Sequence, residues 1–311
     1  DLVRSRGLGD VYKRQEEINM YTQFFGNFLL SKGYITNEQL FDALKEKAQK
    51  HAKLGTLAIH SGLMTAAEVD SVIVEQTHQD KKFGELTIEM GYLTDEQVKE
   101  LLNIQSPDFL LLGQILLDKG IIDNTTLEKS IHDYRSENAI SDLDMVLEDK
   151  DSINHLIGHF FANTGIDPSA IDIMYLELLF NSFIRFVGDD YTPLSAEICD
   201  SFSADCMVRQ DIEGSYAIST YIGMSQTTAI NFASRYVNES FSVYDEYVQA
   251  SLDDFLNLNN GLFLVNCSND QALELTLTAP EHFDGQTRSF NKACKLKLLY
   301  PFGAIHFIIE F

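Results

Sequence analysis

Glycine recurs every 29 residues through the first half of this chain, and this period constrains the fold more than any other feature. Two series keep the same step: Gly26, Gly55, Gly84 and Gly113, and Gly33, Gly62, Gly91 and Gly120. Apolar residues keep register with them, in the columns Leu40, Val69, Val98 and Leu127, and Leu44, Ile73, Leu102 and Ile131. A fixed period of this length is typical of repeat proteins, so four copies of one structural unit are expected.

Each copy carries the signals of two helices joined by a turn. The second glycine of a copy follows the first helix as its C′ residue, where a positive φ is favoured and glycine meets no steric penalty. A threonine then opens the second helix as its N-cap, at Thr36, Thr65 and Thr94. Gln39 and Gln97 follow two of these threonines by three residues, which predicts a capping box at both. The first half is therefore predicted to be all-α, with tandem helical-hairpin repeats.

The repeat FGNFLLSKGYITNEQLFDALKEK and its copies resemble the MshE/GspE-type amino-terminal domain of secretion and pilus ATPases, over residues 24–134. Many members of that family bind cyclic di-GMP. The resemblance makes Lys53, Gly55, Lys82 and Gly84 the candidate ligand-binding residues. The family has arginine where this chain has the two lysines, and lysine lacks the planar fork that stacks on a base and donates two parallel hydrogen bonds. A second interpretation stays open, a helical scaffold for partners whose glycines are caps and close-packing points.

Acidic residues outnumber basic ones by 47 to 23, which gives a formal net charge of −24. Acid is spread over both halves, so the field of the chain repels phosphate backbones and anionic membrane surfaces. We therefore expect no nucleic-acid partner. We also expect no membrane insertion, since no apolar run approaches the roughly 20 residues of a spanning helix.

The four cysteines form no CxxC pair: Cys199, Cys206, Cys267 and Cys294. We interpret them as reduced packing residues of a cytoplasmic protein.

Five segments are expected along the chain. Residues 1–15 look like a translated sequencing adapter and are left out of the fold prediction. Residues 16–78 and 79–136 hold two pairs of repeats, and residues 137–164 form an acidic linker. Residues 165–311 change to a mixed pattern, with a helix over residues 175–186, strands, two further helices and more strands. Strands interrupted by a block of helices favour an α+β domain, an antiparallel sheet with long helices on one face.

The predicted helix over residues 246–265 has two distinct stripes. Its apolar stripe is predicted to face the sheet and contains Val248, Leu252, Phe255 and Leu262. Its second stripe follows the steps i, i+4, i+7 and i+11, and contains Ala250, Asp254, Asn257 and Gly261. This second stripe places a carboxylate and a carboxamide about one turn apart on a face that is turned away from the core.

The same helix resembles the active helix of the CheC/CheX/FliY family of chemotaxis phosphatases, and the likeness covers roughly residues 170–311. The family motif is Asp or Ser, three residues, Glu, two residues, Asn, 22 residues and Pro. This chain has Asp254, Asn257 and, after 22 intervening residues, Pro280. Gly261 also agrees, and the helix containing Asn181 falls within the match. The chain departs at the first position, which is Ala250, and at Asp254, which replaces the family's Glu.

The resemblance implies a phosphatase of the aspartyl phosphate on a CheY-like response-regulator receiver domain, with Asp254 and Asn257 as the catalytic pair. Asn257 would hold the attacking water, since an amide can both accept and donate hydrogen bonds. Asp254 would pair with the receiver's lysine. The chain would need no cofactor of its own, because the partner supplies the Mg²⁺. Whether two copies pair as a homodimer stays open.

Two further features of the sequence bear on metal binding and enzyme class. His155 and His159 lie four residues apart, but no acidic residue follows as in HExxH, so no metal site is predicted. The sequences GxxxxGK[ST], GxSxG and GxGxxG are absent, which argues against nucleotide hydrolysis, α/β-hydrolase chemistry and dinucleotide binding. The alternative to a phosphatase is a non-catalytic signalling adaptor that binds cyclic di-GMP or a protein through its helical repeats.

Overall fold

The computed structural model describes residues 23–46, 52–103, 108–137, 157–158, 161 and 164–311. The chain divides into two compact units, Phe25–Leu147, called the helical unit, and Asp1–Phe24 with Glu148–Phe311, called the sheet unit. The adapter-like segment 1–15, most of the predicted linker and the pair His155 and His159 lie outside the described residues. Within the described residues, no helix is long and apolar enough to cross a membrane.

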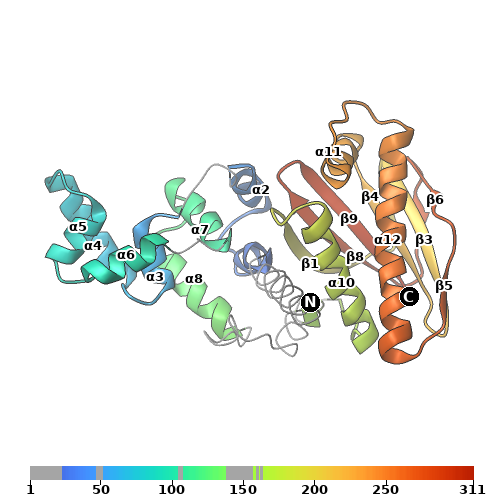
Figure 1. The fold of residues 1–311 in the computed structure, drawn as a ribbon, viewed down its shortest axis with the longest axis horizontal. Coiled ribbons are helices and arrows are strands. Elements are labelled where there is room, and N and C mark those ends of the chain that lie inside the picture. The colour runs from blue at the N-terminus through green and yellow to red at the C-terminus, as the bar shows by residue number, and fades with distance from the viewer. Residues whose placement is uncertain (1–22, 47–51, 104–107, 138–156, 159–160, 162–163) are drawn as a thin grey trace, which may run out of the picture. The chain divides into compact units, whose positions relative to one another are not determined.

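The helical unit consists of helices throughout its described part (Figure 1). A helix that includes residues 25–31 comes first. The others are α2 (Asn37–Glu46), α3 (Leu54–His60), α4 (Ala66–His78), α5 (Phe83–Glu89), α6 (Asp95–Asn103), α7 (Asp108–Asp118) and α8 (Asn124–Glu137). Short and longer helices alternate along α3 to α6, with the pair α7 and α8 after them.

One glycine column lies at the turns after the short helices. Gly33, Gly62, Gly91 and Gly120 have φ angles of 71°, 66°, 77° and 65°. The residue after each of them donates its backbone N–H to a carbonyl five residues back, as in Tyr34 to Leu29, which is the hydrogen bond of a Schellman motif. A residue with a Cβ is strained at such an angle, so these glycines are required by the backbone.

The threonine caps open the second helices as predicted. Thr36 and Gln39 exchange both hydrogen bonds of a capping box, and Thr94 and Gln97 do the same. Thr65 forms a third box, which the sequence analysis missed, with Glu68 as its partner. A box satisfies two backbone N–H groups that a helix start otherwise leaves unpaired.

The other glycine column lies where helices approach each other closely. A Cβ added at Gly55, Gly84 or Gly113 would lie 3.0 Å from Val69, 3.2 Å from Val98 and 2.8 Å from Leu127, respectively. These partners are the first apolar column of the repeat, and all of its members are buried. The second column is only partly buried, because Ile73 and Leu102 are 44% and 66% exposed. The 29-residue period therefore reflects one repeated glycine-to-aliphatic contact between helices.

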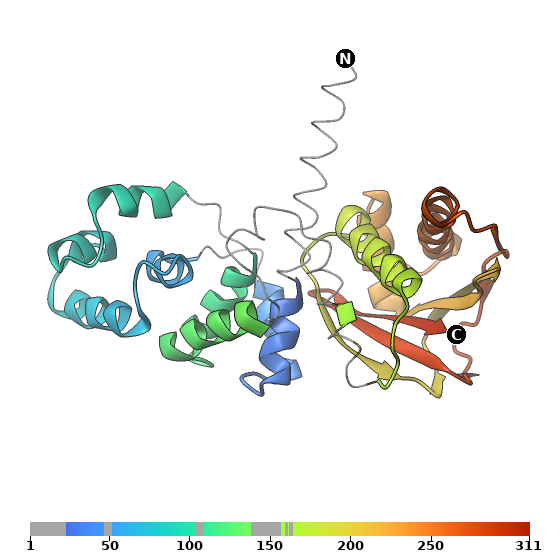
Figure 2. The same ribbon diagram turned by 90° about the horizontal axis from the view of Figure 1, so that it is seen from below.

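The sheet unit is an antiparallel sheet with helices on one face, as predicted (Figures 1 and 2). Its helices are α10 (Ala170–Phe186), α11 (Gln226–Val237) and α12 (Glu246–Gln271). Its strands are β1 (Thr192–Ile198), β2 (Ser201–Phe202), β3 (Cys206–Gly214), β4 (Ile218–Met224), β5 (Leu275–Leu277), β6 (Glu281–His282), β7 (Arg288–Ser289), β8 (Ala293–Tyr300) and β9 (Gly303–Glu310). The strand order is β1-β8-β9-β4-β3-β5, with β6 also paired to β3 and with β2 and β7 paired separately.

Different elements pack on the two faces of the sheet. Alternate residues of β3 point to opposite faces, so Val208, Gln210 and Ile212 face the helices while Met207 and Arg209 face the other way. A smaller cluster covers part of that second face: Cys199, Met207, Tyr221, Phe290, Ala293 and Ile308, with Phe202, Ala204 and Phe283 packed on it. All four cysteines are buried free thiols, which confirms their interpretation as packing residues.

Candidate active site

Helix α12 is longer than the sequence analysis expected and runs from Glu246 to Gln271. Asp245 caps its start by accepting the N–H groups of Tyr247 and Val248. The predicted apolar stripe is buried at Val248, Leu252 and Phe255. Leu262 was placed wrongly, since its side chain is 38% exposed.

The buried face of α12 changes along its length, which explains the error at Leu262. In the later turns the helix buries Asn259, Asn260, Phe263 and Cys267 against the sheet and α10. The contact line therefore drifts around the helix by part of a turn. Leu262, seven residues after Phe255, lies only about 20° around the helix from it. It is exposed because the buried face has by then moved to the side of Asn260 and Phe263.

The candidate stripe faces outward. Ala250, Asp254 and Asn257 are exposed and Gly261 is half-buried, so none of these side chains lies under another part of the described chain. No atom outside the helix lies within 4 Å of a Cβ built at Gly261. A carboxylate and a carboxamide thus stand one turn apart on an open helix surface.

Asn257 is held from below by a residue of the sheet. Its Oδ1 accepts a hydrogen bond of 2.9 Å from Nε2 of Gln210, which lies on β3 and is 1% exposed. The same Nε2 donates to the backbone carbonyl of Thr278 at 2.9 Å. Gln210 therefore links the helix at Asn257 to the segment that leads into Pro280.

A buried polar network continues beneath Asn257, and the sequence analysis did not find it. Asn260 Nδ2 donates to Gln210 Oε1 at 2.9 Å and to Thr220 Oγ1 at 3.0 Å. Tyr175 Oη donates to Asn260 Oδ1 at 2.7 Å and accepts from Asn259 Nδ2 at 3.2 Å. The sequence does hold a signal for this network, the group of amide residues in an otherwise apolar helix, because buried amides must find hydrogen-bond partners.

Asp254 is held by a tyrosine from the neighbouring helix. Tyr236 of α11 donates its hydroxyl to Asp254 Oδ2 at 2.6 Å. The tyrosine ring packs edge-on against Phe255 and stacks on Phe232, so its position is fixed by the core. Partial burial, followed by the hydrogen bond to Asp254, raises the pKa of Tyr236. The hydroxyl therefore stays protonated and donates throughout the neutral range, which leaves Asp254 Oδ1 for an external partner.

The surroundings of the pair are acidic. Asp253, next to Asp254 on α12, pairs with His282 Nε2 at 2.9 Å. Asp284 accepts from Tyr244 Oη at 2.9 Å and from the N–H of Met207. The surface around Asp254 and Asn257 therefore suits a partner that brings positive charge.

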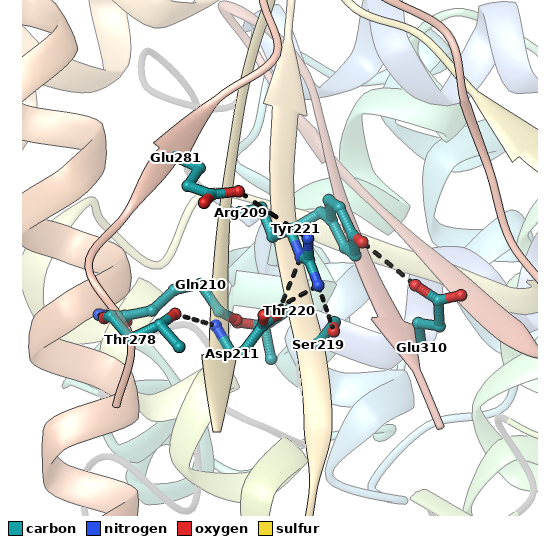
Figure 3. Close-up of polar contacts among 9 residues, drawn as sticks. All are labelled: Arg209, Gln210, Asp211, Ser219, Thr220, Tyr221, Thr278, Glu281 and Glu310. Atoms are coloured by element: carbon teal, nitrogen blue, oxygen red, sulfur yellow. Dashed lines mark hydrogen bonds and ion pairs between the residues drawn. The ribbon is translucent and has the colours of Figure 1, made fainter. Parts of the chain in front are cut away.

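Side-chain contacts on the other face of the sheet hold β3, the strand that carries Gln210, in place (Figure 3). Arg209 pairs with Asp211 at 2.8 Å and lies 3.8 Å from Glu281, while Tyr221 donates to Glu310. Figure 3 shows the Gln210 side chain extending to the opposite side of β3 from that of Arg209. Asp211 also donates its N–H to Thr278 Oγ1 at 3.0 Å. Thr278 is thus held on both sides, by Asp211 and by Gln210.

The candidate residues of the helical unit are only partly brought together. A cavity of about 690 Å³ is lined by Lys53 and Gly55, whereas Lys82 and Gly84 are not among its lining residues. Lys53 Nζ is paired with Asp118 at 2.7 Å. The aspartates Asp70, Asp118 and Asp123 all line this cavity, so acid outweighs base there. No group of three metal-ligating side chains occurs in the part of the chain that the structure describes.

Comparison with known proteins gives structural neighbours only. No protein-family model and no curated protein sequence matches this chain. A CheC-like superfamily protein from Shewanella sp. PV-4 has a TM-score of 0.40 and 15% identity, over 46% of this chain and 98% of that one. The chemotaxis protein CheX of Desulfovibrio desulfuricans has a TM-score of 0.39 and 13% identity, over 45% and 98%.

A third neighbour is the CheX–CheY–BeF3–Mg complex from Borrelia burgdorferi, with a TM-score of 0.35 and 18% identity, over 44% of this chain and 94% of that one. The structural neighbours are thus CheX-like and CheC-like chemotaxis proteins that cover about 45% of the chain.

Proposed function

We propose that the sheet unit is a phosphatase that acts on the aspartyl phosphate of a CheY-like receiver domain in chemotaxis or another two-component pathway. The observation that carries the proposal is the outward-facing pair Asp254 and Asn257, each held by a hydrogen bond from its own domain. The Asn257-to-Pro280 spacing that resembles the phosphatase motif supports it, since Gln210 joins these two segments. The helical unit would then serve as a regulatory or docking arm.

Asn257 would position the attacking water. Hydrolysis of an acyl phosphate needs a water in line with the leaving oxygen, and placing that water is the main task left to the protein. Asn257 is exposed and can approach a phosphoryl group that a partner presents. The receiver brings its own Mg²⁺, which neutralises charge on the phosphoryl oxygens when it is bound there.

Asp254 would bind the lysine of the receiver's pocket and so fix the helix in register. A charge-assisted hydrogen bond between lysine and carboxylate is short and directional. The aspartate is one methylene shorter than the family's glutamate. The hydrogen bond from Tyr236 holds its carboxylate in one position, which reduces the entropy lost when the lysine binds.

The test uses the full chain and a panel of CheY-type receivers labelled with radioactive phosphate. Wild-type protein should speed the loss of label from at least one receiver, and Asn257→Ala should remove that gain. Asn266→Ala is the matched control, because Asn266 lies on the same helix, more than two turns further along. Equal rates with and without wild-type protein across the panel would reject the phosphatase.

We keep one alternative, a cyclic di-GMP sensor or adaptor that acts through the helical unit. The observation that favours it is the cavity beside Lys53 and Gly55, whose volume of about 690 Å³ falls in the range of small-molecule sites. The surplus of aspartate over lysine opposes an anionic dinucleotide, so we place this function second. Calorimetry with cyclic di-GMP tests it: binding that Lys53→Ala weakens would support the sensor. No heat at micromolar protein would remove it.

A further inference from the structure

We infer that Gln210 is a positioning residue for Asn257, which fixes the end of the Asn257 carboxamide that meets the partner. The inference rests on the proposed phosphatase function and goes beyond it, because it assigns a role to a buried residue of the sheet. Gln210 lies 47 positions from Asn257 in the sequence, and the fold brings their side chains to 2.9 Å.

The orientation of the Gln210 amide is determined by a group that cannot change its role. The backbone carbonyl of Thr278 can only accept a hydrogen bond, so the nitrogen of Gln210 must be the atom that faces it. The opposite end of the amide, Oε1, accepts from Asn260. Asn260 is fixed in turn, since its Nδ2 also donates to Thr220 Oγ1 and its Oδ1 accepts from Tyr175. Reversal of the Gln210 amide would place donor against donor at Asn260.

The network therefore decides which way Asn257 points. The second hydrogen of Gln210 Nε2 is donated to Asn257 Oδ1, so this oxygen turns toward the sheet. The NH₂ group of Asn257 then lies on the solvent side, where it can donate to an oxygen of the incoming phosphoryl group or water. Oδ1 keeps one lone pair, and this can accept a hydrogen from the same water.

Burial makes this constraint strong. Gln210 and Asn260 are 1% and 0% exposed, and a buried amide that loses a partner has no water to replace it. An exposed asparagine on a helix would otherwise sample several rotamers. A fixed side chain loses less entropy when the water and phosphoryl group bind, which is the advantage of a pre-organised site.

The experiment compares wild type, Gln210→Met and Tyr191→Phe in the full chain, with the radioactive receiver panel. Gln210→Met keeps the side-chain volume and removes both donors. It should lower kcat by about 10- to 100-fold while the affinity for a BeF₃⁻-loaded receiver changes less than about threefold. Tyr191→Phe is the structural control, because it removes a buried hydrogen bond to the Phe180 carbonyl that lies outside the network. It should lower the unfolding temperature and leave kcat within about twofold of wild type.

The outcomes separate the two proposals. An inactive wild type rejects the phosphatase and, with it, the role of Gln210 in that reaction. An active wild type with an unchanged kcat in Gln210→Met overturns the inference alone. If Gln210→Met does not fold, side-chain ¹⁵N relaxation of wild-type Asn257 decides: we expect an amide about as ordered as that of Asn260, and a freely rotating amide overturns the inference.

Discussion

The Tyr236 hydroxyl on α11 donates a 2.6 Å hydrogen bond to the Asp254 carboxylate on α12, across the contact between these two helices. The two residues are 18 positions apart and belong to separate helices. Because the tyrosine ring is packed among Phe232 and Phe255, the bond ties an exposed acidic group to the hydrophobic core.

Tyr236→Phe should weaken receiver binding without removing the reaction. The ring and its packing stay, but Asp254 loses its orienting donor, so we expect KM for the phosphorylated receiver to rise several-fold while kcat changes little. The loss of one hydrogen bond should lower the free energy of unfolding by about 0.5–1.5 kcal/mol. Tyr247→Phe is the control, because Tyr247 is exposed in the first turn of α12. A KM that rises equally in both variants would contradict the assignment.

Asp254→Asn should raise KM for the receiver by about 10-fold, because the pairing with a lysine depends on the negative charge. Asp253→Asn removes the same charge one residue earlier, where the carboxylate pairs with His282, and should change KM less than about threefold. Steady-state kinetics at two salt concentrations distinguish a local contact from a general field. A purely general field would give both variants the same KM and the same salt dependence.

Gly62→Ala should destabilise the helical unit by about 1 kcal/mol. The φ of Gly62 is 66° and no atom lies within 4 Å of an added Cβ, so the whole effect comes from backbone strain. Gly62→Asn should cost less, since asparagine tolerates this conformation better. Urea unfolding followed by circular dichroism measures both variants. Equal losses for alanine and asparagine would indicate that conformation is not the cause.

The sheet unit should lose stability as the pH falls below neutrality because of His306. Burial, reinforced by Lys295 and Lys297 and partly offset by Glu197, lowers the pKa of His306 to about 4. The unfolded chain therefore binds this proton first, so the stabilisation is complete above pH 6.5 and is lost as the pH falls from 6.5 toward 4. The total should be on the order of 3 kcal/mol.

Urea unfolding between pH 7.5 and 4.5 measures this dependence. His306→Phe should flatten the curve in that window, because phenylalanine fills the contact with Phe202 and carries no proton. His132→Phe is the control, since this histidine is exposed in the helical unit. An unchanged slope in His306→Phe would assign the pH dependence to other groups.

The sequence by itself determined the features that depend on neighbours along the chain. The glycine period, the caps at Thr36 and Thr94, the antiparallel α+β character of the second half and the exposed face of Asp254 and Asn257 all follow from local rules of helix geometry and polarity. These rules operate within one or two turns, so the printed residues are enough to apply them.

Only the tertiary structure decided what holds the candidate pair. Gln210 reaches Asn257 across 47 positions, and Tyr236 reaches Asp254 from another helix. Leu262 became exposed because the packing partner of α12 changes along the helix. Such contacts depend on how the elements cross in space, and neither periodicity nor residue spacing encodes that crossing. The candidate side chains Asp254 and Asn257 could therefore be found from the sequence, whereas their orientation was decided by the fold.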